Sequence, residues 1–118
     1  MNLANAKVAQ VLIPIRDFEK GVAFYRDTLG LPLKFQSPFW TEFRTGETTL
    51  ALHPASGKNP AGACQPGFRV ADLATLYAKR EAMGVTFTAE PTLQHGVMIA
   101  RFLDMDGAEC SISSECAT

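Results

Sequence analysis

The order strand, helix and three further strands occurs twice along this chain, and the fold must accommodate both copies. In the first copy, residues 8–15 are rich in β-branched and apolar side chains and predict a buried strand. Asp17 is placed to cap a helix, and Gly30 is placed to end it. Turn residues then separate three short predicted strands, at residues 33–36, 39–44 and 48–53.

The second copy follows residues 55–63, whose small residues, Gly and Pro are typical of a linker. A strand is predicted at residues 65–70, after which Asp72 caps a second predicted helix that ends at Gly84. The last three predicted strands are at residues 85–88, 97–103 and 108–113. Asp106-Gly107 favours a hairpin turn before the last of them.

This duplication predicts an α+β fold made of two βαβββ modules in tandem, within a single domain over residues 1–118. Module one covers about residues 7–54, the linker 55–63 and module two 64–114. One helix covers one face of each sheet. The other face must pack on its twin sheet or on another subunit, or it must line a cavity.

Composition narrows the function classes. Apolar residues make up 47% of the chain, enough for a core, and the net charge of −1 argues against a general nucleic-acid binder. No apolar run approaches the roughly 20 residues that span a bilayer, and no signal peptide is recognised, so we expect no membrane partner. The three cysteines show no C-x-x-C spacing, which favours reduced thiols in the cytoplasm.

Strand alternation indicates which side chains point away from the helices. Leu50 and Leu52 suit the helix side of their strand, and Cys110 and Ile112 suit the helix side of the last strand. In the strand at residues 39–44 the two faces compete, and the sequence leaves its orientation open. The predicted ligand-lining set is polar and convergent, as in a typical ligand pocket: Gln10, His53, Gln65, Arg69, Glu109 and Ser111, with Trp40 and Arg44 if their strand is turned that way.

Two of these residues are equivalent under the internal repeat. Gln10 lies seven residues before Asp17, and Gln65 lies seven residues before Asp72. The repeat therefore predicts the same polar side chain at the same position of both modules.

Three segments resemble the vicinal oxygen chelate superfamily, which includes glyoxalases, bleomycin-resistance proteins and extradiol dioxygenases. Residues 11–31 hold a strand, Asp17 and a helix ending in Phe-Tyr-x-x-x-Leu-Gly. Residues 50–54 resemble the family's fourth strand, and residues 102–107 resemble its Phe-x-Asp-Pro-Asp-Gly turn, with Met105 in place of proline. The resemblance covers nearly the whole chain and implies mixed sheets that curve round a pocket, which family members usually close as homodimers.

The resemblance also implies a degenerate metal site. Metal-dependent members place ligands on the first, fourth, fifth and eighth strands, and those positions here hold Gln10, Ala51, Gln65 and Ser111. Only Gln10 is a ligand type that the family uses, so we expect no metal cofactor. The alternative is a divalent metal site rebuilt from His53 and Glu109.

Two functions remain open. In a metal-free small-molecule-binding protein, the ligand would be a small organic acid or a planar drug-like compound. Trp40 would stack on this ligand, Gln10, Gln65 and Ser111 would donate hydrogen bonds, and Arg44 and Arg69 would favour an anionic group. In a glyoxalase-like lyase or isomerase, or a dioxygenase, His53 or His95 would transfer protons. No nucleophile triad or phosphate-binding loop is found in the sequence.

Overall fold

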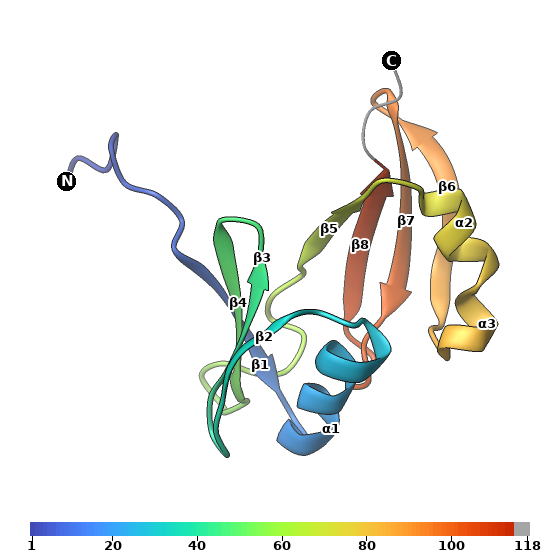
Figure 1. The fold of residues 1–118 in the computed structure, drawn as a ribbon. Coiled ribbons are helices and arrows are strands. Elements are labelled where there is room, and N and C mark those ends of the chain that lie inside the picture. The colour runs from blue at the N-terminus through green and yellow to red at the C-terminus, as the bar shows by residue number, and fades with distance from the viewer. Residues whose placement is uncertain (115–118) are drawn as a thin grey trace.

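The first module forms a four-stranded sheet, here called sheet A, with the order β1-β4-β3-β2 (Figure 1). The computed structural model describes residues 1–114. β1 runs parallel to β4, and the other neighbours are antiparallel. The elements of module one are β1 (Gln10–Ile15), α1 (Phe18–Ala23), the π-helical turn η1 (Phe24–Thr28), β2 (Leu33–Gln36), β3 (Thr41–Thr45) and β4 (Thr48–Pro54).

The second module repeats this arrangement in a second four-stranded sheet, sheet B, with the order β5-β8-β7-β6. β5 runs parallel to β8, as β1 does to β4. The elements are β5 (Gly67–Val70), α2 (Leu73–Ala78), α3 (Arg80–Met83), β6 (Phe87–Gln94), β7 (Val97–Leu103) and β8 (Glu109–Ser114). The predicted α+β fold with two tandem βαβββ modules is therefore confirmed.

Both helices begin where the sequence predicts. The Asp17 carboxylate accepts a hydrogen bond from the backbone N–H of Lys20, and the Asp72 carboxylate accepts one from the backbone N–H of Thr75, at 3.3 and 3.1 Å. Each predicted helix is divided, however. α1 widens into the π-turn η1 at Phe24, and a change of backbone angles at Lys79 separates α2 from α3.

The sequence-based bounds of the sixth strand were wrong. The prediction ended it at residue 88, but β6 continues to Gln94 and includes Pro91. Proline removes a ladder donor and is tolerated at a sheet edge or an irregularity. β6 is an edge strand of sheet B, and its pairing with β7 shifts register between Ala89 and Thr92, around that proline.

Two apolar clusters form the core, one under each sheet. The first contains seven buried residues: Ile13, Ile15, Val22, Tyr25, Phe43, Leu50 and Leu52. The second contains six: Leu73, Val85, Ala100, Phe102, Cys110 and Ile112. Phe24, Leu29 and Phe68 pack against both clusters, so the end of the first helix connects the two modules (Figure 1). The predicted helix-facing positions of β4 and β8 are confirmed.

Polar contacts also connect the modules at the turn between β7 and β8. The Tyr25 hydroxyl donates to Asp104 Oδ2 at 3.4 Å, and the backbone N–H of Arg16 donates to Asp106 Oδ2 at 2.9 Å. Asp104 Oδ1 accepts from the backbone N–H groups of Asp106 and Ala108, at 2.9 Å each. This turn therefore contributes both to its own hairpin and to the attachment of module one.

No helix within residues 1–114 is long and apolar enough to cross a membrane. Cys64 and Cys110 are free thiols, while Cys116 lies outside the described residues.

Candidate functional site

The orientation of β3 determines which side chains share the face of sheet A opposite α1, here called the helix-free face. Thr41 and Phe43 are buried on the helix side, where they pair with Leu52 and Leu50. Alternation therefore places Trp40, Glu42 and Arg44 on the helix-free face, with Thr49, Ala51 and His53 of β4 and Gln10, Leu12 and Pro14 of β1. The orientation that the sequence left open is thus resolved in favour of Trp40 and Arg44.

Trp40 and His53 form an aromatic hollow at one end of this face. Their rings are nearly parallel, with an interplanar angle of 20° and centroids 6.3 Å apart. The hollow has a volume of about 410 Å³. It is lined by Leu12 and Pro14 of β1, by Trp40 and His53, and by three residues of the connecting segment: Asn59, Ala63 and Cys64.

Hydrogen bonds hold both rings in place. Trp40 Nε1 donates to Glu42 Oε2 at 2.7 Å, and the other carboxylate oxygen of Glu42 lies 3.5 Å from Lys34 Nζ. His53 Nδ1 lies 3.1 Å from the Pro54 carbonyl oxygen. Because a carbonyl oxygen can only accept, Nδ1 is the donor of this hydrogen bond. The hollow therefore offers two flat ring faces that are held in fixed orientations.

Cys64, His53 and Asn59 line the same hollow, and these are residue types that some cysteine hydrolases use. Their surroundings do not activate the thiol. Burial raises the pKa of Cys64, whereas a nucleophilic cysteine needs a lowered one. His53 Nδ1 is bonded to a backbone carbonyl rather than to an amide or carboxylate side chain. The arrangement suits noncovalent contact with a ligand.

A second hollow, here called the arginine hollow, has a volume of about 620 Å³ and lies between the β3–β4 hairpin and β5. Arg44 and Arg69, both exposed, line it together with Thr49 and Gly67. Arg44 and its sheet partner Thr49 come from the other end of the helix-free face, whereas Val11 and Leu50 come from the helix side, so this hollow lies at the end of sheet A. Two guanidinium groups at one opening favour a carboxylate or another anion.

The remaining predicted residues are distributed elsewhere. On sheet B, Glu109 accepts hydrogen bonds from Gln65 and Thr88, each at 3.1 Å, and lies 3.7 Å from Arg101 Nε. Ser111 pairs with Gly67 and Arg101 in the same sheet. Gln10 pairs with Thr49 on sheet A. None of Gln10, Gln65, Glu109 and Ser111 lines either hollow.

His95 occupies the turn between β6 and β7, where it is exposed and has a φ of 50°. It lines neither hollow. Strand alternation also missed three residues of the aromatic hollow, Asn59, Ala63 and Cys64, because they lie in the connecting segment and follow no strand periodicity.

The residues at the family's metal positions do not suit a metal. Ala51 is fully buried at the middle of β4 and offers no donor atom. His53 and Glu109, the pair for a rebuilt site, lie on different sheets, and both Glu109 carboxylate oxygens already accept hydrogen bonds. Within residues 1–114, no three His, Cys, Asp or Glu side chains are grouped so that they could hold an ion.

The fold defines a protein of two tandem βαβββ modules, each with one four-stranded mixed sheet. The family model of the Glyoxalase/Bleomycin resistance protein/Dioxygenase superfamily matches residues 7–112, and the chain belongs to this superfamily. The predicted family is thus confirmed. A comparison with curated proteins found no match.

Solved structures share this fold over nearly the whole chain. TnmS3, an antibiotic binding protein from Streptomyces sp. CB03234, is similar with a TM-score of 0.83 and 24% identity, over 96% of this chain and 98% of that one. A superfamily member from Sphaerobacter thermophilus DSM 20745 is similar with a TM-score of 0.80 and 24% identity, over 93% of this chain and 98% of that one. A lactoylglutathione lyase from Agrobacterium tumefaciens is similar with a TM-score of 0.74 and 18% identity, over 92% of this chain and 93% of that one. Because a binding protein and an enzyme share the fold, the fold does not decide between them.

Proposed function

We propose that this chain is a metal-free binding protein for a planar organic compound, preferably one with an acidic group. The observation that carries the proposal is the aromatic hollow, in which Trp40 and His53 are held nearly parallel by hydrogen bonds to Glu42 and Pro54. Flat, apolar, pre-oriented rings favour a planar ligand because little side-chain entropy is lost on binding.

The geometry of sheet A supports an acidic group at one end of the ligand. His53 and Thr49 are four residues apart on β4, and Thr49 is the partner of Arg44. At about 3.3 Å per residue, the aromatic hollow and the arginine hollow are roughly 13 Å apart along the strand. A compound with several fused rings spans that distance, whereas a smaller organic acid would occupy one hollow only.

Ala51 lies between these two ends, and its side chain has no atom that could bind a metal, which supports binding without a metal. The raised pKa of Cys64 supports noncovalent capture. The similarity to TnmS3, itself described as an antibiotic binding protein, supports a drug-like ligand. We also propose a cytoplasmic homodimer, since Leu12 remains 42% exposed on the helix-free face and a second copy would cover it.

The test combines metal analysis with ligand titration. Elemental analysis is made on protein without a histidine tag, before and after dialysis against zinc, nickel, manganese and ferrous iron. Planar drugs and fused-ring acids such as anthracene-2-carboxylate are then titrated, with Trp40 as the fluorescent reporter because it is the only tryptophan. We expect no stoichiometric metal and saturable quenching by at least one planar compound.

The controls use calorimetry, so that they do not depend on the reporter. Trp40→Leu should weaken binding about tenfold or more, and Phe39→Leu, a matched change at a 73% exposed neighbour, should not. Equal affinity in both variants would remove the aromatic hollow from the function. One divalent ion per protomer, lost in His53→Ala, would instead establish a rebuilt metal site and contradict the metal-free proposal.

A further inference from the structure

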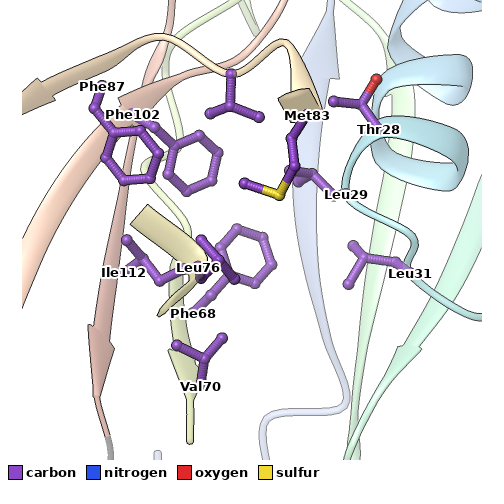
Figure 2. Close-up of a pocket in the computed structure, with 11 residues that line it drawn as sticks. Thr28, Leu29, Leu31, Phe68, Val70, Leu76, Met83, Phe87, Phe102 and Ile112 are labelled. Carbon is purple, nitrogen blue, oxygen red and sulfur yellow. The ribbon is translucent and has the colours of Figure 1, made fainter. Parts of the chain in front are cut away.

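The structure contains an apolar cavity on the helix side of sheet B. It adjoins the arginine hollow, with which it shares Leu31, Phe68 and Val70, and it has no lining residue in common with the aromatic hollow. Its volume is about 120 Å³. Sheet B contributes five lining residues: Phe68, Val70, Phe87, Phe102 and Ile112. Three come from α2, α3 and the loop after α3: Leu76, Met83 and Val85. The last three come from the end of η1 and the loop that follows it: Thr28, Leu29 and Leu31. Figure 2 shows Met83, Leu29 and Leu76 converging on one space between these elements.

The lining has no charged residue, and its only polar side chain is the hydroxyl of Thr28. In Figure 2 this hydroxyl lies at the rim and points away from Met83. A water molecule in a cavity needs two to four polar partners, which this lining does not offer. The cavity therefore favours an apolar occupant over water.

One wall of the cavity is aromatic. Phe68 and Phe102 have ring centroids 6.2 Å apart, and Phe87 and Phe102 have centroids 5.8 Å apart. Opposite this wall, Met83 provides a flexible thioether that adapts to the shape of an occupant and contacts aromatic edges favourably. The chemistry of both walls matches a small aromatic ring.

The surrounding backbone provides a route of entry. Met83 ends the four-residue helix α3, which is detached from α2 at Lys79 and followed by Gly84 with φ of 71°. Leu29 and Leu31 flank Gly30, which also has a positive φ of 70°. Short helical segments with few packed neighbours open locally at low cost in free energy. Residues of module one and module two would both contact a molecule held there.

We propose that this cavity is a second ligand site, which takes a small, neutral, apolar molecule of about the size of benzene. An apolar cavity of about 150 Å³ engineered in another protein stays free of water and binds benzene, so the volume observed here is of the right order. The site binds by exclusion of water and by contact with Phe68, Phe87 and Phe102. It is distinct from the aromatic hollow, which shares none of its lining residues, and it borders the arginine hollow at Leu31, Phe68 and Val70.

Benzene is the probe for the test, and methyl-resolved NMR of the complete chain is the measurement. We expect saturable shifts of the Met83 and Ile112 methyl groups, with those of Leu12 in the aromatic hollow unchanged. Benzoate should leave the Met83 and Ile112 signals in place, because a carboxylate would lose its hydration in this cavity. Benzene shifts confined to Leu12, or no saturable shift at Met83 and Ile112, would overturn the proposal.

Cavity-filling variants provide a second test of the benzene site. Leu76→Phe and, in an independent variant, Leu31→Phe add a ring to the lining and should weaken benzene binding at least tenfold. Leu93→Phe is the matched control at a 68% exposed position outside the cavity, and it should bind as the natural chain does. A folded filling variant with undiminished benzene affinity would refute the site. If neither variant folds, the methyl shifts of the natural chain decide the question alone.

Discussion

Tyr25 and Asp104, 79 positions apart in the chain, share a buried hydrogen bond of 3.4 Å between the phenol oxygen and Oδ2. The tyrosine comes from η1 in module one, and the aspartate from the turn between β7 and β8 in module two. Burial raises the pKa of Tyr25, so the phenol remains a protonated donor under ordinary conditions. The bond therefore contributes, with the Arg16–Asp106 hydrogen bond and the shared apolar packing, to holding the two modules together.

We expect Tyr25→Phe to lower the free energy of unfolding by about 1–2 kcal/mol, because Asp104 then loses a buried donor while the ring packing is kept. Urea denaturation measures the change. Tyr77→Phe is the matched control, since Tyr77 is only partly buried and contacts Phe87 and Arg80 through its ring. If the free energy of unfolding falls no more in Tyr25→Phe than in Tyr77→Phe, the hydrogen bond contributes nothing measurable to stability.

Asp104 should give the stability of the protein an acidic pH dependence. Burial is the largest effect on Asp104 and raises its pKa above the ordinary value of 3.8, although backbone hydrogen bonds from Ala108 and Asp106 act in the opposite direction. The folded chain thus binds this proton more tightly than the unfolded chain. Stability from this group is present below pH 3.8 and is lost as the pH rises through the raised folded value.

The measurement compares Asp104→Asn with the natural chain by urea denaturation from pH 3 to pH 7. The difference in unfolding free energy should move in favour of the asparagine variant as the pH rises through this range. Asp27→Asn should show the opposite sign, because the hydrogen bond from Arg26 lowers the pKa of Asp27. An Asp104 carboxyl that titrates in NMR at or below 3.8 would contradict the prediction.

Gly21 should not tolerate a side chain. A Cβ at this position would lie 2.4 Å from Ile15 Cγ2 and 3.1 Å from Met105 Cε, where β1, α1 and the module-two turn meet. We expect Gly21→Ala to lower the free energy of unfolding by about 1–3 kcal/mol despite the better helix propensity of alanine. Gly57→Ala, where a Cβ would meet nothing within 4 Å, is the control. Equal thermal midpoints for the two variants would show that the contact relaxes freely.

The arginine hollow should affect acidic ligands selectively. We expect Arg44→Ala and Arg69→Ala each to weaken binding of the three-ring acid anthracene-2-carboxylate by about 0.5–1 kcal/mol, a modest effect because both side chains are exposed and solvent screens the pair. Binding of a neutral planar compound should not change. Lys58→Ala removes the same charge from the exposed linker and serves as the calorimetric control. An equal loss in all three variants would mean that only the net charge matters.

Much of this architecture follows from local physical chemistry. Asp17 and Asp72 begin helices because an aspartate at this position satisfies backbone N–H groups, and alternation places Leu50 and Leu52 under α1 in any sheet that buries one face. The resemblance over residues 11–31 and 102–107 then predicted the superfamily, which the family model confirms. The end of β6 was predicted wrongly, because the sequence does not show that β6 is an edge strand, where Pro91 is tolerated.

The candidate site depended on contacts between distant segments. Periodicity named Trp40, Arg44 and His53, but only the pairing of β3 with β4 turned the first two toward the same face as His53. The connecting segment supplies Asn59, Ala63 and Cys64 through its path across that face, which no local pattern encodes. The apolar cavity likewise arises where η1 meets α2 and α3 over sheet B. The sequence by itself thus determined the repeated modules, the caps and the faces of most strands, because these depend on neighbouring residues. Tertiary structure alone decided which side chains share a hollow, because that depends on how the modules pack.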